Sequence, residues 1–62
     1  MSPYFKVGKL YRYLDVVILV LANKGPLQGV MAYDDEIVDY ITHNGNVIED
    51  RVLTPSLWTP VG

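Results

Sequence analysis

The sequence predicts a small all-β barrel of five short strands with a one-turn 3-10 helix near its C-terminus. Alternating apolar runs flank His43-Asn44-Gly45-Asn46. Asn-Gly between two such runs is a strong hairpin signal, because a tight hairpin needs positive φ at its central residues. The second run leads into residues 54–61, where the Pro and Ser content indicates a single helical turn that closes the barrel.

Residues 9–14 form the first predicted strand, because apolar and polar side chains alternate along them. We expect Leu10 and Leu14 to face the core. The opposite face of the strand then carries Tyr11 and Tyr13, which we expect on the surface.

Residues 16–22 form a continuous apolar run, rich in Val and Ile, which lose rotamer freedom in a helix. The run predicts a strand buried on both faces, and it is far shorter than the roughly 20 residues of a membrane span. Residues 23–26 predict a turn from their Asn, Gly and Pro content. Residues 28–33 predict a further strand, in which Gly29 permits a bulge.

Residues 36–42 fit two assignments. Ile37, Tyr40 and Ile41 stand at helical spacing, and the acidic residues before them suit a helix N-terminus. The segment is short for a helix, however, and the Asn-Gly turn requires a strand before it, so we predict a strand. Residues 47–53 are the return strand.

The C-terminal tail predicts the helical turn in more detail. Thr54 can cap the turn and Pro55 suits its first position, where a missing N–H is harmless. We expect Leu57 and Trp58 to fold back over the open end of the sheet.

The chain of 62 residues indicates one small domain, residues 1–62, in which we expect residues 1–5 to fray. It has no cysteine and His43 is its only histidine, so disulfides, thiolate zinc sites and histidine clusters are excluded. We therefore predict no cofactor and no metal. The lack of cysteine also favours a cytoplasmic protein.

Charge is unevenly distributed although the net charge is only −2. Residues 1–24 carry a net charge of +3, and residues 25–62 carry a net charge of −5. We expect the two halves to neutralise each other in space; the alternative is an acidic face for a basic partner.

Two segments resemble Src-homology-3 domains. Leu10-Tyr11-Arg12-Tyr13 looks like their Leu-Tyr-Asp-Tyr opening, and Thr54-Pro55-Ser56-Leu57-Trp58 looks like their Pro-Ser-Asn-Tyr closing turn. The long acidic loop and the paired tryptophans of that family have no counterpart here. The resemblance therefore implies a Src-homology-3-like barrel without the family's proline-peptide site.

A second resemblance spans roughly residues 6–61. Lys6-Val7-Gly8-Lys9-Leu10-Tyr11-Arg12 is similar to the opening phrase of very short Src-homology-3-like proteins from tailed bacteriophages. It implies the same fold, a viral genome and a location in the host cytoplasm. It implies no catalytic residues.

The predicted function is a non-enzymatic protein-interaction module, such as a phage-encoded host-directed or virion accessory protein. Exposed aromatic and arginine side chains often anchor protein interfaces, and acidic residues can steer a basic partner. The predicted partner-binding residues are Tyr11, Arg12, Tyr13, Trp58, Asp34, Asp35 and Glu36.

Three alternatives to this function are weaker. Lys6, Lys9, Arg12 and Lys24 could form a basic stripe for nucleic acid, although the overall acidity opposes it. The acidic cluster could bind a hard cation, but it lacks the ligand spacing of a calcium loop. His43 has no nucleophile pattern nearby, so we predict no enzyme. We also predict a homodimer, because a short barrel can leave an unpaired strand edge.

Overall fold

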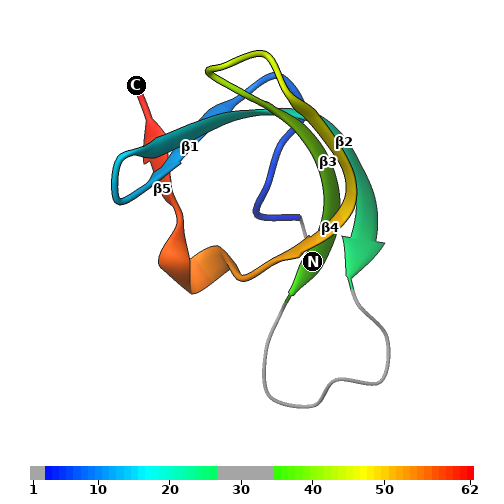
Figure 1. The fold of residues 1–62 in the computed structure, drawn as a ribbon. Helices are drawn as coiled ribbons and strands as arrows, with labels where there is room; N and C mark the ends of the chain where they lie inside the picture. The colour runs from blue at the N-terminus through cyan, green and yellow to red at the C-terminus, as the bar shows by residue number, and fades with distance from the viewer. Residues whose placement is uncertain (1–2, 27–34) are drawn as a thin grey trace.

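The computed structural model describes residues 3–26 and 35–62, and these residues fold as the predicted all-β domain (Figure 1). The described part contains β1 (Leu10–Tyr13), β2 (Val16–Pro26), β3 (Glu36–Thr42), β4 (Val47–Leu53), the 3-10 turn η1 (Pro55–Leu57) and β5 (Thr59–Val61). The strand predicted at residues 28–33, with Gly29, lies outside the described residues, as does Asp34. No helix among the described residues is long and apolar enough to cross a membrane.

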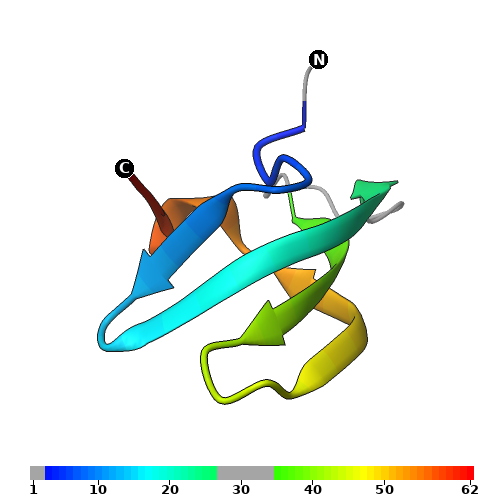
Figure 2. The same cartoon turned by 90° about the horizontal axis from the view of Figure 1, so that it is seen from above.

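The five strands of the described residues form one antiparallel sheet in the order β4-β3-β2-β1-β5. The sheet curls strongly, and η1 carries the chain from β4 at one edge to β5 at the other (Figures 1 and 2). Within residues 3–26 and 35–62, β4 and β5 do not pair with each other, so the sheet is open. The all-β prediction is confirmed, whereas closure into a barrel is not observed.

Strand β1 presents the opposite face to the core from the one predicted. Tyr11 is 3% exposed, whereas Leu10 and Leu14 are 41% and 75% exposed. The Tyr11 hydroxyl donates to the Tyr4 carbonyl oxygen at 2.8 Å and accepts from the Lys6 N–H at 2.8 Å. Because the hydroxyl both donates and accepts a hydrogen bond inside the protein, the large ring can be buried without leaving a polar group unpaired.

Strand β2 is longer than predicted and is buried on one face only. Asn23 pairs with Val38 and Pro26 with Glu36, so the turn predicted at residues 23–26 is wrong. Ile18 and Val20 are each 1% exposed, whereas Leu21 is 43% exposed. A single curved sheet has a hollow side and an outer side, and the outer side of β2 has no second layer over it among the described residues.

The hollow side of the sheet holds the hydrophobic core. Its buried members are Phe5, Tyr11, Ile18, Val20, Val38, Tyr40 and Leu53, with Tyr4, Ile48 and Trp58 packed against them. Figure 1 shows the N-terminal segment, in blue, running inside the curve of the sheet. The prediction that residues 1–5 fray is therefore wrong for Tyr4 and Phe5.

Phe5 is the centre of this packing. It is 0% exposed, and its ring lies edge-on to the rings of Tyr4 and Tyr11, with both centroid distances at 5.0 Å. A curled sheet this small leaves a hollow that its own side chains do not fill. A segment outside the sheet fills it.

Glu36 fastens the N-terminal segment to β3. The Tyr4 N–H donates to Oε2 at 2.7 Å, the Phe5 N–H donates to Oε1 at 3.0 Å, and the Asn23 amide donates to Oε1 at 2.9 Å. Glu36 is only 6% exposed. A buried carboxylate is tolerated when several donors surround it, and here they also fix the path of the chain.

The β3–β4 hairpin is confirmed, and so is the strand assignment of residues 36–42. At its tip the Gly45 N–H donates to the Thr42 carbonyl at 2.9 Å, and Gly45 has a φ of +88°. This left-handed conformation explains why the sequence has Gly after Asn at this position.

The helical turn η1 is also confirmed. The Leu57 N–H donates to the Thr54 carbonyl at 3.0 Å, and the Trp58 N–H donates to the Pro55 carbonyl at 3.2 Å. The Thr54 side chain makes no capping hydrogen bond, so that part of the prediction is wrong. Trp58 packs on the core as expected, but Leu57 is 51% exposed and does not.

Candidate interaction surface

The turn between β1 and β2 consists of Leu14 and Asp15, because Tyr13 and Val16 form the last pair of the ladder. Leu14 has a φ of +55°, in the left-handed region where a side chain other than Gly is strained. A hairpin turn of this length prefers Gly where φ is positive. The leucine at this position costs roughly 1–2 kcal/mol of conformational energy and is 75% exposed to water.

Tyr13 and Trp58 form an aromatic pair beside this turn. Their ring centroids are 5.5 Å apart with an interplanar angle of 49°. The pair exists because β5 runs antiparallel to β1, with Thr59 opposite Arg12. The Tyr4 hydroxyl donates to the Trp58 carbonyl oxygen at 2.5 Å and fixes the backbone of the tryptophan.

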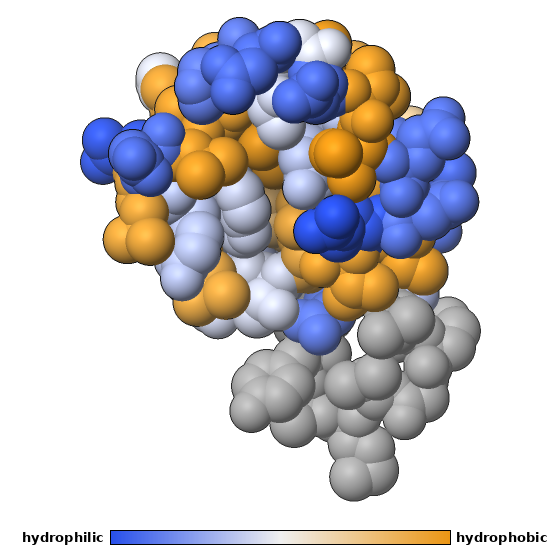
Figure 3. All heavy atoms as spheres, in the orientation of Figure 1, coloured by the Kyte–Doolittle hydropathy of each residue, from blue (hydrophilic) through white to orange (hydrophobic). Residues whose placement is uncertain are grey.

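We call the exposed and half-buried apolar residues around this pair the aromatic patch: Tyr13, Leu14, Val16, Leu57 and Trp58. Tyr13 is 38% exposed, and Leu57 is 51% exposed. In Figure 3, apolar and weakly polar atoms reach the surface on the side where Figure 1 places the β1–β2 turn and η1. The patch combines two aromatic rings, of a kind enriched at protein-binding surfaces, with protruding aliphatic side chains.

The three predicted site residues on β1 lie in different parts of the structure. Tyr13 and Trp58 come together, as the prediction of an aromatic surface required. Arg12 is exposed, but it points to the other face of the sheet, opposite Val17 and Thr59. Tyr11 belongs to the core, so its assignment as an exposed partner-binding residue is wrong.

The predicted acidic triplet does not form an exposed cluster. Glu36 is buried and hydrogen-bonded to the N-terminal segment, so its assignment as a steering residue is wrong. Asp35 is half-buried, and its Oδ1 has no hydrogen-bond partner among the described residues. Asp34 lies outside the described residues.

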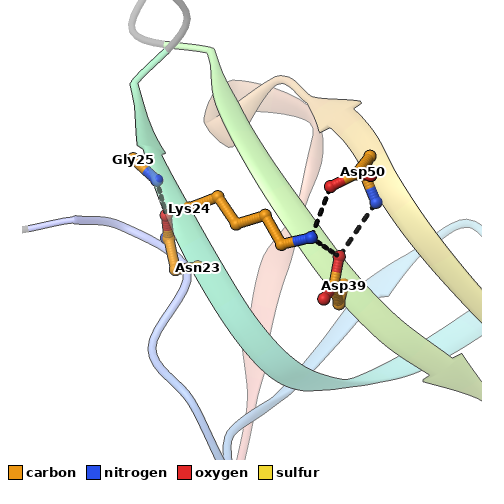
Figure 4. A network of polar contacts seen from close by, with 5 residues as sticks. All are labelled: Asn23, Lys24, Gly25, Asp39 and Asp50. Carbon is orange, nitrogen blue, oxygen red and sulfur yellow. Dashed lines mark hydrogen bonds and ion pairs between the residues drawn. The ribbon is translucent and has the colours of Figure 1, made fainter.

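Carboxylates gather instead at a bulge of β4, where Asp50 is exposed and Asp39 is half-buried (Figure 4). Asp39 alone stands opposite Glu49 and Asp50, and Asp50 has a φ of +54°. The Asp50 N–H donates to Asp39 Oδ1 at 2.9 Å, and Lys24 Nζ lies 3.4 Å from Asp39 Oδ1 and 2.5 Å from Asp50 Oδ1. The Asp39 carboxylate thus accepts a hydrogen bond from the N–H of Asp50, a residue that the bulge leaves without a partner in the β-ladder.

This network shifts two pKa values. The hydrogen bond from the Asp50 N–H, aided by Lys24, lowers the pKa of Asp39 below its ordinary 3.8. The hydrogen bond to Asp50, aided by Asp39, raises the pKa of Lys24 above its ordinary 10.5. Both shifts favour the charged forms of Asp39 and Lys24.

We predict that Asp39→Asn removes a pH-dependent part of the stability. A lowered folded pKa gives stabilisation that is present above the unfolded pKa of about 4 and is lost as pH falls through the folded pKa. Urea unfolding at neutral pH should therefore show the variant less stable than the wild type, with the difference shrinking toward about pH 2. Glu49→Gln, an exposed neighbour on β4, should show a much smaller difference. A constant Asp39→Asn difference across this range would contradict the assignment.

The basic stripe predicted for nucleic acid is not formed as a unit. Lys24 pairs with Asp39 and Asp50 at the bulge. Lys6 and Lys9 line a groove beside β5, and Arg12 is on the outer face of the sheet. His43 is exposed in the hairpin turn. In the described parts of the chain, no three side chains of the His, Cys, Asp and Glu types are grouped to hold a metal ion.

The edge of the sheet at β4 bears on the predicted homodimer. The bulge at Asp50 interrupts this strand, and Glu49, Asp50 and Arg51 are exposed along it. Bulges and charges on an edge strand hinder pairing with another edge. The homodimer stays a prediction, and this edge does not favour it.

Comparison of the chain with protein-family models, curated proteins and solved structures gave no match.

Leu14, Val16 and Leu57 are members of the patch that the sequence prediction missed. Leu14 was assigned to the buried face of β1 because a leucine at alternate spacing ordinarily points inward. The position of Leu14 could have been predicted from the length of the connection, since only Leu14 and Asp15 separate two strongly β-forming runs. A connection of that length places both residues in the turn.

Proposed function

We propose that the protein is a non-enzymatic interaction module built on a Src-homology-3-like barrel, and that the aromatic patch docks onto a protein partner. The barrel assignment is supported by the strand order β4-β3-β2-β1-β5 and by a 3-10 turn between β4 and β5. The resemblance of residues 6–12 to short phage proteins supports the further proposal of a phage-encoded accessory protein that acts on a bacterial host protein.

The observation that carries this proposal is the state of Leu14. It is the most exposed of the large apolar side chains in the described residues, and its backbone is in the left-handed region. Folding gains little from a leucine here, since a glycine would remove the strain without uncovering any core. A residue that is unfavourable for the fold, yet placed beside a partly exposed aromatic pair, is best explained by a contact made outside the chain.

The aromatic pair supplies the anchor of the docking site. Tyr13 and Trp58 are held by the β1–β5 pairing and by the hydrogen bond from Tyr4 to the Trp58 carbonyl. Because their rings are fixed before binding, little side-chain entropy is lost when a partner covers them. Aromatic residues of this kind are enriched among those that carry most of the binding energy of an interface.

We predict that Leu14→Gly raises stability and weakens binding in the same molecule. Relief of the left-handed strain should raise the free energy of unfolding by about 1 kcal/mol. Loss of the exposed side chain should weaken partner binding by about tenfold. The stability is measured by urea unfolding, and the binding is measured by affinity capture from bacterial lysate followed by titration of the purified partner.

The matched control is Val7→Gly, because Val7 is also an exposed aliphatic residue, at 63%, and lies outside the patch. This control should leave binding unchanged. If Leu14→Gly and Tyr13→Ala both keep the wild-type affinity for the captured partner, the aromatic patch is not the docking site.

A further inference from the structure

A groove of about 550 Å³ lies at the end of β1 away from the aromatic patch. Its walls are the N-terminal segment, the start of β1 and strand β5. The patch includes Tyr13 at one end of β1, and the groove includes Leu10 at the other, so the two surfaces are separated by roughly 10 Å along the strand. The groove is therefore a second candidate site, independent of the first.

Four N–H groups of the N-terminal segment beside the groove are already used within the protein. The N–H groups of Tyr4 and Phe5 donate to Glu36. The Lys6 N–H donates to the Tyr11 hydroxyl, and the Lys9 N–H donates to the Lys6 carbonyl at 3.1 Å. These N–H groups therefore cannot pair with an added strand.

The tyrosine hydroxyls at the groove are used as well. Tyr4 donates to the Trp58 carbonyl, and Tyr11 donates to the Tyr4 carbonyl. The ammonium groups of Lys6 and Lys9 differ from them, because neither pairs with a carboxylate within residues 3–26 and 35–62. These two ammonium groups are thus the charged side chains that the groove offers to a ligand.

The remaining surface of the groove is apolar. Leu10 and Val61 are directly opposite each other in the β1–β5 ladder, and they are 41% and 42% exposed. Pro3, Pro60 and Gly62 complete the lining beside them. A ligand that fits this surface combines aliphatic side chains with negative charge.

We propose that this groove binds an acidic peptide segment of a partner protein, with aliphatic side chains against Leu10 and Val61 and carboxylates paired with Lys6 and Lys9. Charge complementarity favours an acidic segment, since the cations are placed together on a chain whose net charge is −2. A nucleic acid fits less well. The Tyr4 and Tyr11 rings pack on each other and on Phe5, so their faces are not free to stack with bases.

The test uses the full chain and short blocked peptides in which Glu and Leu alternate, with binding followed by fluorescence anisotropy. The Glu-Leu peptide should bind, and the Gln-Leu peptide of equal length should bind at least roughly tenfold more weakly, because it lacks the charges. Lys6→Glu combined with Lys9→Glu should abolish binding of the acidic peptide. Arg51→Glu, which makes the same kind of change at an exposed residue of β4, should leave it unaltered.

Lys6→Gln combined with Lys9→Gln is the second variant, and circular dichroism checks that both variants fold. Equal binding of the Glu-Leu and Gln-Leu peptides would overturn the proposal, and so would unaltered binding in both lysine variants. Tighter binding of an oligothymidine than of the acidic peptide, lost in the same variants, would assign the groove to nucleic acid and overturn it too. Leu14→Gly should not affect the peptide, so this proposal and the docking patch can fail separately.

Discussion

Phe5→Ala is expected to remove at least about a third of the stability of the protein. Phe5 is fully buried between the rings of Tyr4 and Tyr11, although it lies outside every strand. Truncating a buried phenylalanine costs about 3–5 kcal/mol. A domain of 62 residues has a total stability of roughly 3–9 kcal/mol, so this single change removes from about a third to all of it.

The measurement is urea unfolding followed by circular dichroism and Trp58 fluorescence. Val7→Ala is the matched control, because Val7 is two residues away and 63% exposed. It should change the free energy of unfolding by less than about 0.5 kcal/mol. A Phe5→Ala variant within about 1 kcal/mol of the wild type would show that the N-terminal segment does not belong to the core.

Glu36→Ala is expected to destabilise the protein by about 3 kcal/mol, because it leaves buried donors unsatisfied. The N–H groups of Tyr4 and Phe5 and the side chain of Asn23 all lose their acceptor. Amide hydrogen exchange should show the effect locally as well, with protection at Tyr4 and Phe5 falling more than protection at Ile18 or Val20 in the core of β2.

The variant Glu36→Gln tests whether the charge of Glu36 matters, because glutamine has nearly the same shape as glutamate but no charge. The amide keeps one acceptor oxygen, but its NH₂ group then faces an N–H of the N-terminal segment, where no hydrogen bond can form. This variant should lie between the wild type and Glu36→Ala. Glu49→Ala, an exposed carboxylate on β4, should have little effect. Equal stability of Glu36→Ala and Glu49→Ala would contradict the role assigned to Glu36.

The sequence was sufficient to predict the β3–β4 hairpin and η1, because each depends on local chemistry. Gly45 supplies the positive φ that the hairpin turn needs, and Pro55 presets the first residue of the helical turn. Such features are set by a few neighbouring residues, so they can be predicted without knowledge of the rest of the fold.

The face of β1 could not be predicted in the same way. Leucine and tyrosine alternate along this strand, and both can be buried, so the alternation does not say which face is inside. The answer depends on Tyr4 and Lys6, whose backbone groups satisfy the Tyr11 hydroxyl. These contacts exist only once the N-terminal segment has entered the hollow of the sheet, which is a property of the whole fold.

The candidate site was predicted only in part, again because its contacts depend on the whole fold. Tyr13 and Trp58 were both among the predicted partner-binding residues, but their contact depends on the pairing of β5 with β1. Glu36 was assigned to the surface because a carboxylate in an acidic run is ordinarily solvated. Its burial follows from three hydrogen-bond donors, two of them backbone groups on a distant segment. The amino-acid composition does not indicate such donors.

The most direct test of the proposed docking function is a nuclear magnetic resonance titration of the labelled protein with the partner captured from bacterial lysate. We predict that the largest shift changes fall on the amides of Tyr13, Leu14 and Leu57 and on the indole N–H of Trp58. Shift changes centred on β3 and β4, with these four signals unmoved, would contradict the assignment of the aromatic patch as the docking surface.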